Sequence, residues 1–148
     1  MSQSAFARGV NSVVRFLLRS PLHRKLSKSI VLIGYRGRRT GKAYLTPANY
    51  VRMDGVLSVL SNRERLWWRN LRGLPQASLV LRGRRLQARP RVLEDRTEVI
   101  AALDAHLRRV PWLARTLGVG MAGDGQWNAE DLDRIAERTV VILFELPT

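Results

Sequence analysis

Residues 36–42, Arg-Gly-Arg-Arg-Thr-Gly-Lys, are the segment of this sequence whose side chains are best suited to binding an anion. The two glycines allow the backbone to turn tightly and to expose N–H groups. Arg38, Arg39 and Lys42 add positive charge, and Thr40 adds a hydroxyl. The segment therefore indicates a site for a phosphate or for carboxylates, although a solvated basic turn has the same composition.

A second polar and aromatic group lies further along the chain. Ser61 and Asn62 end a predicted strand, and Arg63 comes next. Trp67 and Trp68 then adjoin each other on a predicted short helix, where neighbouring side chains point about 100° apart. One indole can thus enter the core while the other covers a cavity. Alternatively, the two tryptophans form a hydrophobic plug under a loop.

The hydrophobic pattern predicts a sheet with helices at its rim. Predicted strands cover residues 30–35, 43–53, 56–61, 77–81, 86–93 and 140–146, and predicted helices cover 66–73, 95–110 and about 128–138. Tight turns such as Asp54-Gly55 join successive strands, which makes the sheet mainly antiparallel. We expect an α+β, mainly β fold, a small split β-barrel of about six strands. Pro47 cannot donate to a ladder, so a bulge or a strand edge is expected there.

The chain begins with an amphipathic, basic segment, and we expect residues 1–27 to be separate from a barrel domain at residues 28–148. Within residues 4–18 the apolar side chains recur near helical spacing, with arginines elsewhere around the helix. Such a helix either packs on the body of the protein or contacts an anionic membrane surface through residues 4–19.

The 148 residues carry 26 Lys and Arg against 12 Asp and Glu, a formal charge of +14. We therefore expect an anionic partner: a nucleotide-like cofactor, a nucleic acid or an anionic membrane surface. The absence of cysteine excludes disulfides, Cys-ligated zinc and thiol catalysis. His23 and His106 are the only histidines and lack carboxylates at metal-binding spacing, so no metal site is expected.

The expected location is cytoplasmic. No apolar run reaches the roughly 20 residues that span a bilayer, and the N-terminus lacks the layout of a signal peptide. A peripheral position at the inner membrane face is left open by the amphipathic segment.

The motifs described above occur in an order that is more specific than any one of them. Tyr-x-Gly-Arg-Arg-Thr-Gly-Lys, Thr-Pro, Tyr-Val, Asp-Gly and Trp-Trp-x-Asn-Leu together resemble the deazaflavin-dependent nitroreductase family over about residues 13–93. The resemblance implies a split β-barrel related to the FMN-binding flavoprotein barrels. The family's usual cofactor is coenzyme F420, a deazaflavin with a phosphodiester and an oligoglutamate tail, and FMN is the alternative.

The resemblance also implies a set of cofactor-binding residues. The phosphate and tail would be contacted by Arg38, Arg39 and Thr40. One edge of the ring would be contacted by Thr46, Pro47, Ala48 and Asn49, and its other side by Ser61, Asn62 and Arg63. The pocket wall would be formed by Trp67 and Trp68, and Asn70 would fix their helix. A polyanionic cofactor suits a fixed arginine cluster.

Two features depart from the family pattern. Some relatives have an arginine where this chain has Tyr44, and Lys42 can supply that charge instead. Relatives that reduce nitro compounds carry several tyrosines near the C-terminus, whereas residues 110–121 contain none. By position, the substrate mouth would be lined by Trp112, Leu117, Met121 and Trp127. No catalytic side chain is identified.

The resemblance implies an F420-dependent oxidoreductase. It would transfer a hydride from reduced deazaflavin to a small planar electron acceptor, quinone-like or nitroaromatic, while the protein supplies position and electrostatics. Two other functions stay open: a non-catalytic split-barrel binder of a lipid, a fatty acid or FMN, and a nucleic-acid-binding barrel that uses its tryptophans and arginines. A homodimer is also left open.

Overall fold

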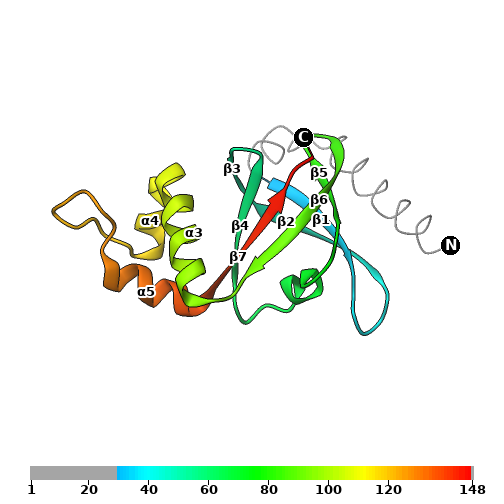
Figure 1. The fold of residues 1–148 in the computed structure, drawn as a ribbon, viewed down its shortest axis with the longest axis horizontal. Coiled ribbons are helices and arrows are strands. Elements are labelled where there is room, and N and C mark those ends of the chain that lie inside the picture. Colours follow the sequence, from blue (N-terminus) through cyan, green and yellow to red (C-terminus); the bar gives the residue numbers. More distant parts are fainter. Residues whose placement is uncertain (1–29, 148) are drawn as a thin grey trace.

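Strand alternation produces the inner face of the sheet. In β1 (Ile30–Arg36) the side chains of Val31, Ile33 and Tyr35 belong to the main buried cluster, whereas Leu32 between them does not. The computed structural model describes residues 30–147, which contain seven strands, a 3-10 helix and three α-helices (Figure 1). The predicted segments at residues 1–27 and 4–19 lie outside this range.

All seven strands pair antiparallel in one sheet, in the order β2-β1-β5-β6-β7-β4-β3. The remaining strands are β2 (Ala43–Asn49), β3 (Val51–Met53), β4 (Val56–Asn62), β5 (Ala77–Leu81), β6 (Arg84–Leu93) and β7 (Thr139–Glu145). The two edge strands, β2 and β3, are separated only by Tyr50, and β2 also contacts β4. The sheet therefore curls into a split barrel, and the predicted α+β, mainly β class is confirmed.

The strand count differs from the expected six because the predicted strand at residues 43–53 divides at Tyr50. Its first part pairs with β1 and its last part pairs with β4, so one stretch of chain serves both edges of the sheet. Pro47 lies in the edge strand β2, opposite Leu32 of β1, which confirms the expected edge position.

Two hairpin turns have the same backbone geometry. Asp54 and Gly55 join β3 to β4 with φ of 43° and 79°, and Arg82 and Gly83 join β5 to β6 with φ of 49° and 77°. Positive φ at both central residues is the geometry of a type I′ turn, which matches the twist of the flanking strands. The predicted hairpin at Asp54-Gly55 is confirmed.

The helices form a layer beside β4 and β7. The layer contains α3 (Arg96–Arg109), α4 (Pro111–Leu117) and α5 (Ala129–Arg138), and α3 packs on both other helices and on both strands (Figure 1). Asp95 caps α3 by accepting from the Glu98 amide, and Asn128 caps α5 by accepting from the Asp131 amide.

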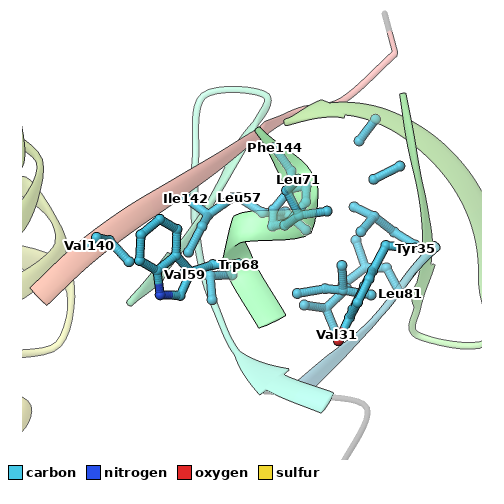
Figure 2. Close-up of a cluster of buried hydrophobic side chains, with 14 residues drawn as sticks. Val31, Tyr35, Leu57, Val59, Trp68, Leu71, Leu81, Val140, Ile142 and Phe144 are labelled. Atoms are coloured by element: carbon cyan, nitrogen blue, oxygen red, sulfur yellow. The ribbon is translucent and has the colours of Figure 1, made fainter. Parts of the chain in front are cut away.

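The main core lies inside the barrel, and Trp68 is its largest fully buried side chain. Figure 2 shows this indole in the same cluster as Val59 and Val140, with Tyr35 and Val31 on the other side of the barrel. Trp68 comes from η1 (Trp67–Leu71), the 3-10 helix that replaces the predicted helix at residues 66–73. The short helix thus plugs the barrel with one of its two tryptophans.

A buried polar pair joins the helical layer to the barrel. His106 of α3 is 4% exposed, Ser58 of β4 is fully buried, and the Ser58 Oγ lies 2.8 Å from the His106 Nδ1. Burial lowers the pKa of His106 from 6.5 to about 4, so the imidazole is neutral in the folded protein at neutral pH.

This pair predicts an acid-sensitive fold. The unfolded chain takes up the His106 proton near pH 6.5 but the folded chain only near pH 4, so stability is full above pH 6.5 and falls as the pH drops to 4. The whole pKa difference corresponds to about 3 kcal/mol. Urea unfolding at pH 7.0 and 5.0 measures the loss. His106→Gln, although less stable at pH 7.0, should lose less on acidification, and an unchanged pH dependence in that variant would contradict the assignment.

Candidate functional site

The basic turn between β1 and β2 is held by hydrogen bonds within the turn. The Gly37 amide donates to the Lys42 carbonyl at 2.9 Å, the Gly41 amide to the Gly37 carbonyl at 2.8 Å, and the Lys42 amide to the Thr40 hydroxyl at 3.3 Å. A Cβ on Gly37 would lie 2.8 Å from the Tyr44 ring, so only glycine fits there without a shift. The turn is therefore an ordered structure.

The turn is also fastened to η1. The Arg38 amide donates to the Asn70 Oδ1 at 3.0 Å, and the Arg38 guanidinium donates to the Arg72 carbonyl at 2.6 Å. Asn70 in turn donates through its Nδ2 to the Trp67 carbonyl at 3.2 Å. The expectation that Asn70 fixes the helix understates its contacts, because the same side chain also positions the basic turn.

These contacts leave a defined set of donors at the tip of the turn. The amides of Arg39 and Thr40 and the side chains of Arg39 and Lys42 make no hydrogen bond or ion pair with another described residue, and all three residues are exposed. Two adjacent N–H groups flanked by two cations have the chemistry of a phosphate or carboxylate site. Arg38, by contrast, uses its guanidinium to hold the turn.

Aromatic and hydroxyl side chains gather on the inner face next to this turn. The Tyr35 hydroxyl lies 2.9 Å from the Thr46 hydroxyl, and its ring stacks on Tyr44 with the centroids 5.7 Å apart. The Trp67 ring lies 6.4 Å from the Tyr35 ring, and the Trp67 Nε1 donates to the Ser61 Oγ at 3.0 Å. Residues from β1, β2, β4 and η1 thus form one contiguous cluster, in which Tyr35 and Ser61 are buried. We call this cluster the aromatic wall: Tyr35, Tyr44, Thr46, Ser61 and Trp67.

Tyr35 is the member of the aromatic wall that the sequence interpretation did not assign to the site. It connects Thr46 of β2 with Trp67 of η1, although it lies in the buried strand β1 and is only 7% exposed. Strand alternation was the available signal, because Tyr35 falls in step with the core residues Val31 and Ile33.

The four residues expected along the ring edge point to two faces of β2. Residues directly opposite in an antiparallel pair lie on the same face, and Ile33 faces Thr46 while Val31 faces Ala48. Thr46 and Ala48 are therefore on the inner face. Pro47 and Asn49 alternate with them and lie on the outer face. Within one chain, Thr46 belongs to the aromatic wall, and Ala48 shares its face of β2 and packs against the main core.

Asn62 and Arg63 are engaged in local structure. The Asn62 Oδ1 accepts from the Glu64 amide at 2.9 Å, and its carbonyl accepts from the Trp68 Nε1 at 3.3 Å. The Arg63 Nη2 donates to the carbonyls of Glu94 and Thr139 at 2.9 and 3.1 Å. These contacts fix the end of β4 behind η1, and a cofactor contact from either side chain stays a prediction.

An ion pair supports η1 from the other side. Arg72 donates to both carboxylate oxygens of Glu94, at 2.9 and 2.5 Å, and its guanidinium lies 4.9 Å from the Trp68 ring centre. The hydrogen bonds from Arg72 hold the pKa of Glu94 below its ordinary value. Since Arg72 also accepts from Arg38 through its carbonyl, it connects the plugged barrel to the basic turn.

The predicted substrate residues lie elsewhere in the chain. Trp112 and Leu117 belong to α4, and Met121 pairs with Trp127 in the loop before α5. Figure 1 shows α4 and this loop on the opposite side of the molecule from the basic turn. Trp112 and Met121 are 65% and 60% exposed, whereas Leu117 and Trp127 pack on the helical cluster. A single chain does not bring them to the aromatic wall, and their role stays a prediction.

The described residues contain no group of three or more His, Asp or Glu side chains that could hold a metal ion. His106 is buried against Ser58, as described above. Residues 30–147 also contain no helix long and apolar enough to cross a membrane.

Comparison with known proteins gives likenesses of structure only. No protein-family model matches the sequence, and no curated protein matches it. A putative 5-nitroimidazole antibiotic resistance protein from Bacteroides thetaiotaomicron has a TM-score of 0.55 at 13% identity, covering 88% of this chain and 81% of that one. A FAD-binding protein from Mesorhizobium loti has a TM-score of 0.52 at 15% identity, covering 87% and 91%.

An F420-H2-dependent reductase is a further structural neighbour. Its TM-score is 0.51 at 18% identity, and the match covers 78% of this chain and 94% of that one. At such identities the likeness shows the fold alone. The chain therefore has the split-barrel fold that is also found in a FAD-binding protein and in an F420-H2-dependent reductase.

Proposed function

We propose that this protein is an oxidoreductase that binds a phosphate-bearing deazaflavin, coenzyme F420, with FMN as the alternative cofactor. The observation that carries the proposal is the tip of the basic turn, where two adjacent amides and the side chains of Arg39 and Lys42 make no hydrogen bond or ion pair with another described residue. The aromatic wall beside the turn supplies Tyr44 and Trp67 for contact with a ring. The shared fold of a FAD-binding protein and an F420-H2-dependent reductase supports the same proposal.

The residues present fit the chemistry of such a cofactor. A phosphate takes N–H donors and fixed positive charge, which the Arg39 and Thr40 amides and the Arg39 guanidinium offer. An oligoglutamate tail takes further cations, and Lys42 lies in the same exposed turn. On the inner face, the rings of Tyr44 and Trp67 offer apolar contact and the Thr46 hydroxyl offers a polar contact to a heterocycle. The buried Tyr35 stacks on Tyr44, and the buried Ser61 accepts from Trp67, so both hold these rings in place.

The cofactor would supply the hydride chemistry, and the protein's residues would supply position and electrostatics. Asn70 and Arg38 hold the turn at a fixed distance from η1, which sets the span between the anion site and the aromatic wall. The Ser61 hydroxyl fixes the Trp67 indole, so the ring surface is ordered before a ligand binds. Preorganised groups lose little conformational freedom on binding.

The proposed acceptor is a small planar molecule, quinone-like or nitroaromatic. Trp112, Leu117, Met121 and Trp127 stay the proposed substrate residues, and they could reach a site only through a second copy or a rearrangement. One structural neighbour is a domain-swapped dimer, which supports the proposal of a homodimer. The non-catalytic binder and the nucleic-acid-binding barrel are outcomes that the experiments below distinguish.

The first prediction concerns the cofactor itself. F420 and FMN, titrated separately, should quench the tryptophan fluorescence of the protein at micromolar concentration, because Trp67 forms part of the proposed ring surface. Trp67→Phe should remove most of the quenching, while Trp112→Phe, on the exposed face of α4, should keep it. No quenching by either cofactor would reject the cofactor proposal.

The second prediction tests the anion site at the turn. Arg39→Gln should weaken FMN or F420 binding by roughly tenfold to a hundredfold, the range for a hydrogen bond to a charged group. Riboflavin, which lacks the phosphate, should bind the variant and the parent equally. Arg115→Gln removes the same charge from the exposed side of α4 and serves as the control. Equal losses for riboflavin and FMN would contradict the phosphate assignment.

The third prediction concerns Asn70 as a positioning residue. Asn70→Ala removes both the acceptor for the Arg38 amide and the donor to the Trp67 carbonyl, so the affinity for FMN should fall about tenfold. Asn70→Asp keeps the acceptor for Arg38 and should restore part of that loss. If neither variant changes the ratio of FMN to riboflavin affinity, Asn70 does not position the turn.

Activity separates the enzyme from a binder. Reduced F420 should be oxidised in the presence of menadione, and the rate should fall with Arg39→Gln as cofactor binding falls. Tight cofactor binding without turnover on menadione or on a nitroimidazole would favour the non-catalytic binder.

A further inference from the structure

The charges of the protein are divided between its two parts. Residues 30–93, which include the first six strands, carry fourteen Lys and Arg but only two acidic residues. Residues 94–147, with the three helices and β7, carry six Lys and Arg against ten acidic residues. Ion pairs within the helical part neutralise much of its charge, such as those of Arg108 with Asp104 and of Arg134 with Asp131. Among residues 30–147, the excess positive charge therefore belongs to the barrel.

One part of that excess lies at the β5–β6 turn. Arg82, Arg84 and Arg85 are all exposed, and none of their side chains forms an ion pair or hydrogen bond with another described residue. Arg89, further along β6, has Glu145 opposite it in the sheet, and Arg91 lies 3.8 Å from Glu98. Within the β5–β6 hairpin, the three arginines at the turn are thus the ones without an acidic neighbour in register or in contact.

The backbone at this turn indicates that arginine is present for a reason other than folding. Arg82 has φ of 49°, in the left-handed region that Asn, Asp and Gly adopt with least strain. The equivalent turn between β3 and β4 has Asp54 at the same place, with φ of 43°. The two turns have the same backbone geometry, but Asp54 is a residue favoured at this position and Arg82 is not. Such backbone strain is commonly kept where a side chain has a function.

The start of β1 lies toward the end of the sheet that carries this turn. Leu32 of β1 pairs with Val80 of β5, two residues before Arg82, and Ile30 precedes Leu32 by two residues. In the sequence, residues 1–29 contain six Lys and Arg and no acidic residue. The anion site at residues 36–42 follows the other end of β1.

We propose that the end of the barrel formed by the β5–β6 turn docks on an anionic membrane surface, with Arg82, Arg84 and Arg85 contacting lipid phosphates and carboxylates. Clustered basic side chains are attracted to anionic lipid, and each Lys or Arg near the surface strengthens binding by about fivefold. A single-stranded nucleic acid would need exposed aromatic rings for stacking, and the exposed large apolar side chains among the described residues, Tyr44, Leu66, Trp112 and Met121, lie in other segments.

Vesicle sedimentation tests the proposal. The full-length protein is mixed with vesicles of phosphatidylcholine alone or with 30% phosphatidylserine at about 0.1 M salt, where surface charges are screened over about 10 Å. We expect binding only to the anionic vesicles. The triple variant Arg82→Asn, Arg84→Gln, Arg85→Gln should bind about a hundredfold more weakly, at about fivefold for each arginine.

A matched triple variant separates a local surface from net charge. Arg109→Gln, Arg115→Gln, Arg138→Gln removes three exposed cations from the helical layer and should retain most of the binding. Equal losses in the two triple variants would overturn the proposal, as would unchanged binding in the turn variant. Loss of duplex DNA binding in the turn variant, with vesicle binding kept, would overturn it in favour of a nucleic acid.

The single variant Arg82→Asn separates function from folding. Asparagine is favoured at positive φ, so the urea midpoint should stay the same or rise while vesicle binding falls about fivefold. A lower midpoint together with weaker binding would assign Arg82 a structural role and reject the proposal. The turn variants should bind FMN or F420 as the parent does, because the anion site lies beyond the other end of β1.

Discussion

The barrel depends on one stretch of chain that serves as both edges of its sheet. β2 and β3 are consecutive, with Tyr50 between them, yet the first pairs with β1 and the second with β4. A flat sheet cannot bring its two outer strands into the same continuous segment, so this connection obliges the sheet to curl. The curl then places the inner face of β2 near β1, β4 and η1. The aromatic wall is the direct result, since its members come from those four elements.

The fold could be predicted from the sequence where local signals agree with the tertiary structure. Asp54-Gly55 and the apolar run of β1 specify a turn and a buried strand by chemistry that acts over a few residues. The division at Tyr50 could not be predicted in this way, because residues 43–53 read as one continuous strand. Residues 43–53 are divided into two strands only because β2 pairs with β1 and β3 pairs with β4, and these partners lie in other segments of the chain.

The candidate site was predictable to a similar degree. The basic turn and the tryptophans were identified from residue types, and Trp68 does enter the core as one of the two indoles was expected to do. The partners of each polar side chain were not predictable. Tyr35 looked like an ordinary core residue, and Pro47 and Asn49 looked like neighbours of Thr46 although alternation turns them to the other face.

The arginines illustrate why counting charges does not locate a ligand. Arg38 and Arg63, two cations predicted to contact a cofactor, donate to backbone carbonyls and so also hold the protein together, as does Arg72 by its pairing with Glu94. A guanidinium has five N–H donors, and Arg38 and Arg63 share theirs between these carbonyls and any ligand. Arg39 and Lys42 differ because they stand at the tip of a turn that η1 fixes from below. The capacity to bind an anion is therefore set by which donors the fold leaves over, and that depends on Asn70 and Arg38 as much as on the cations themselves.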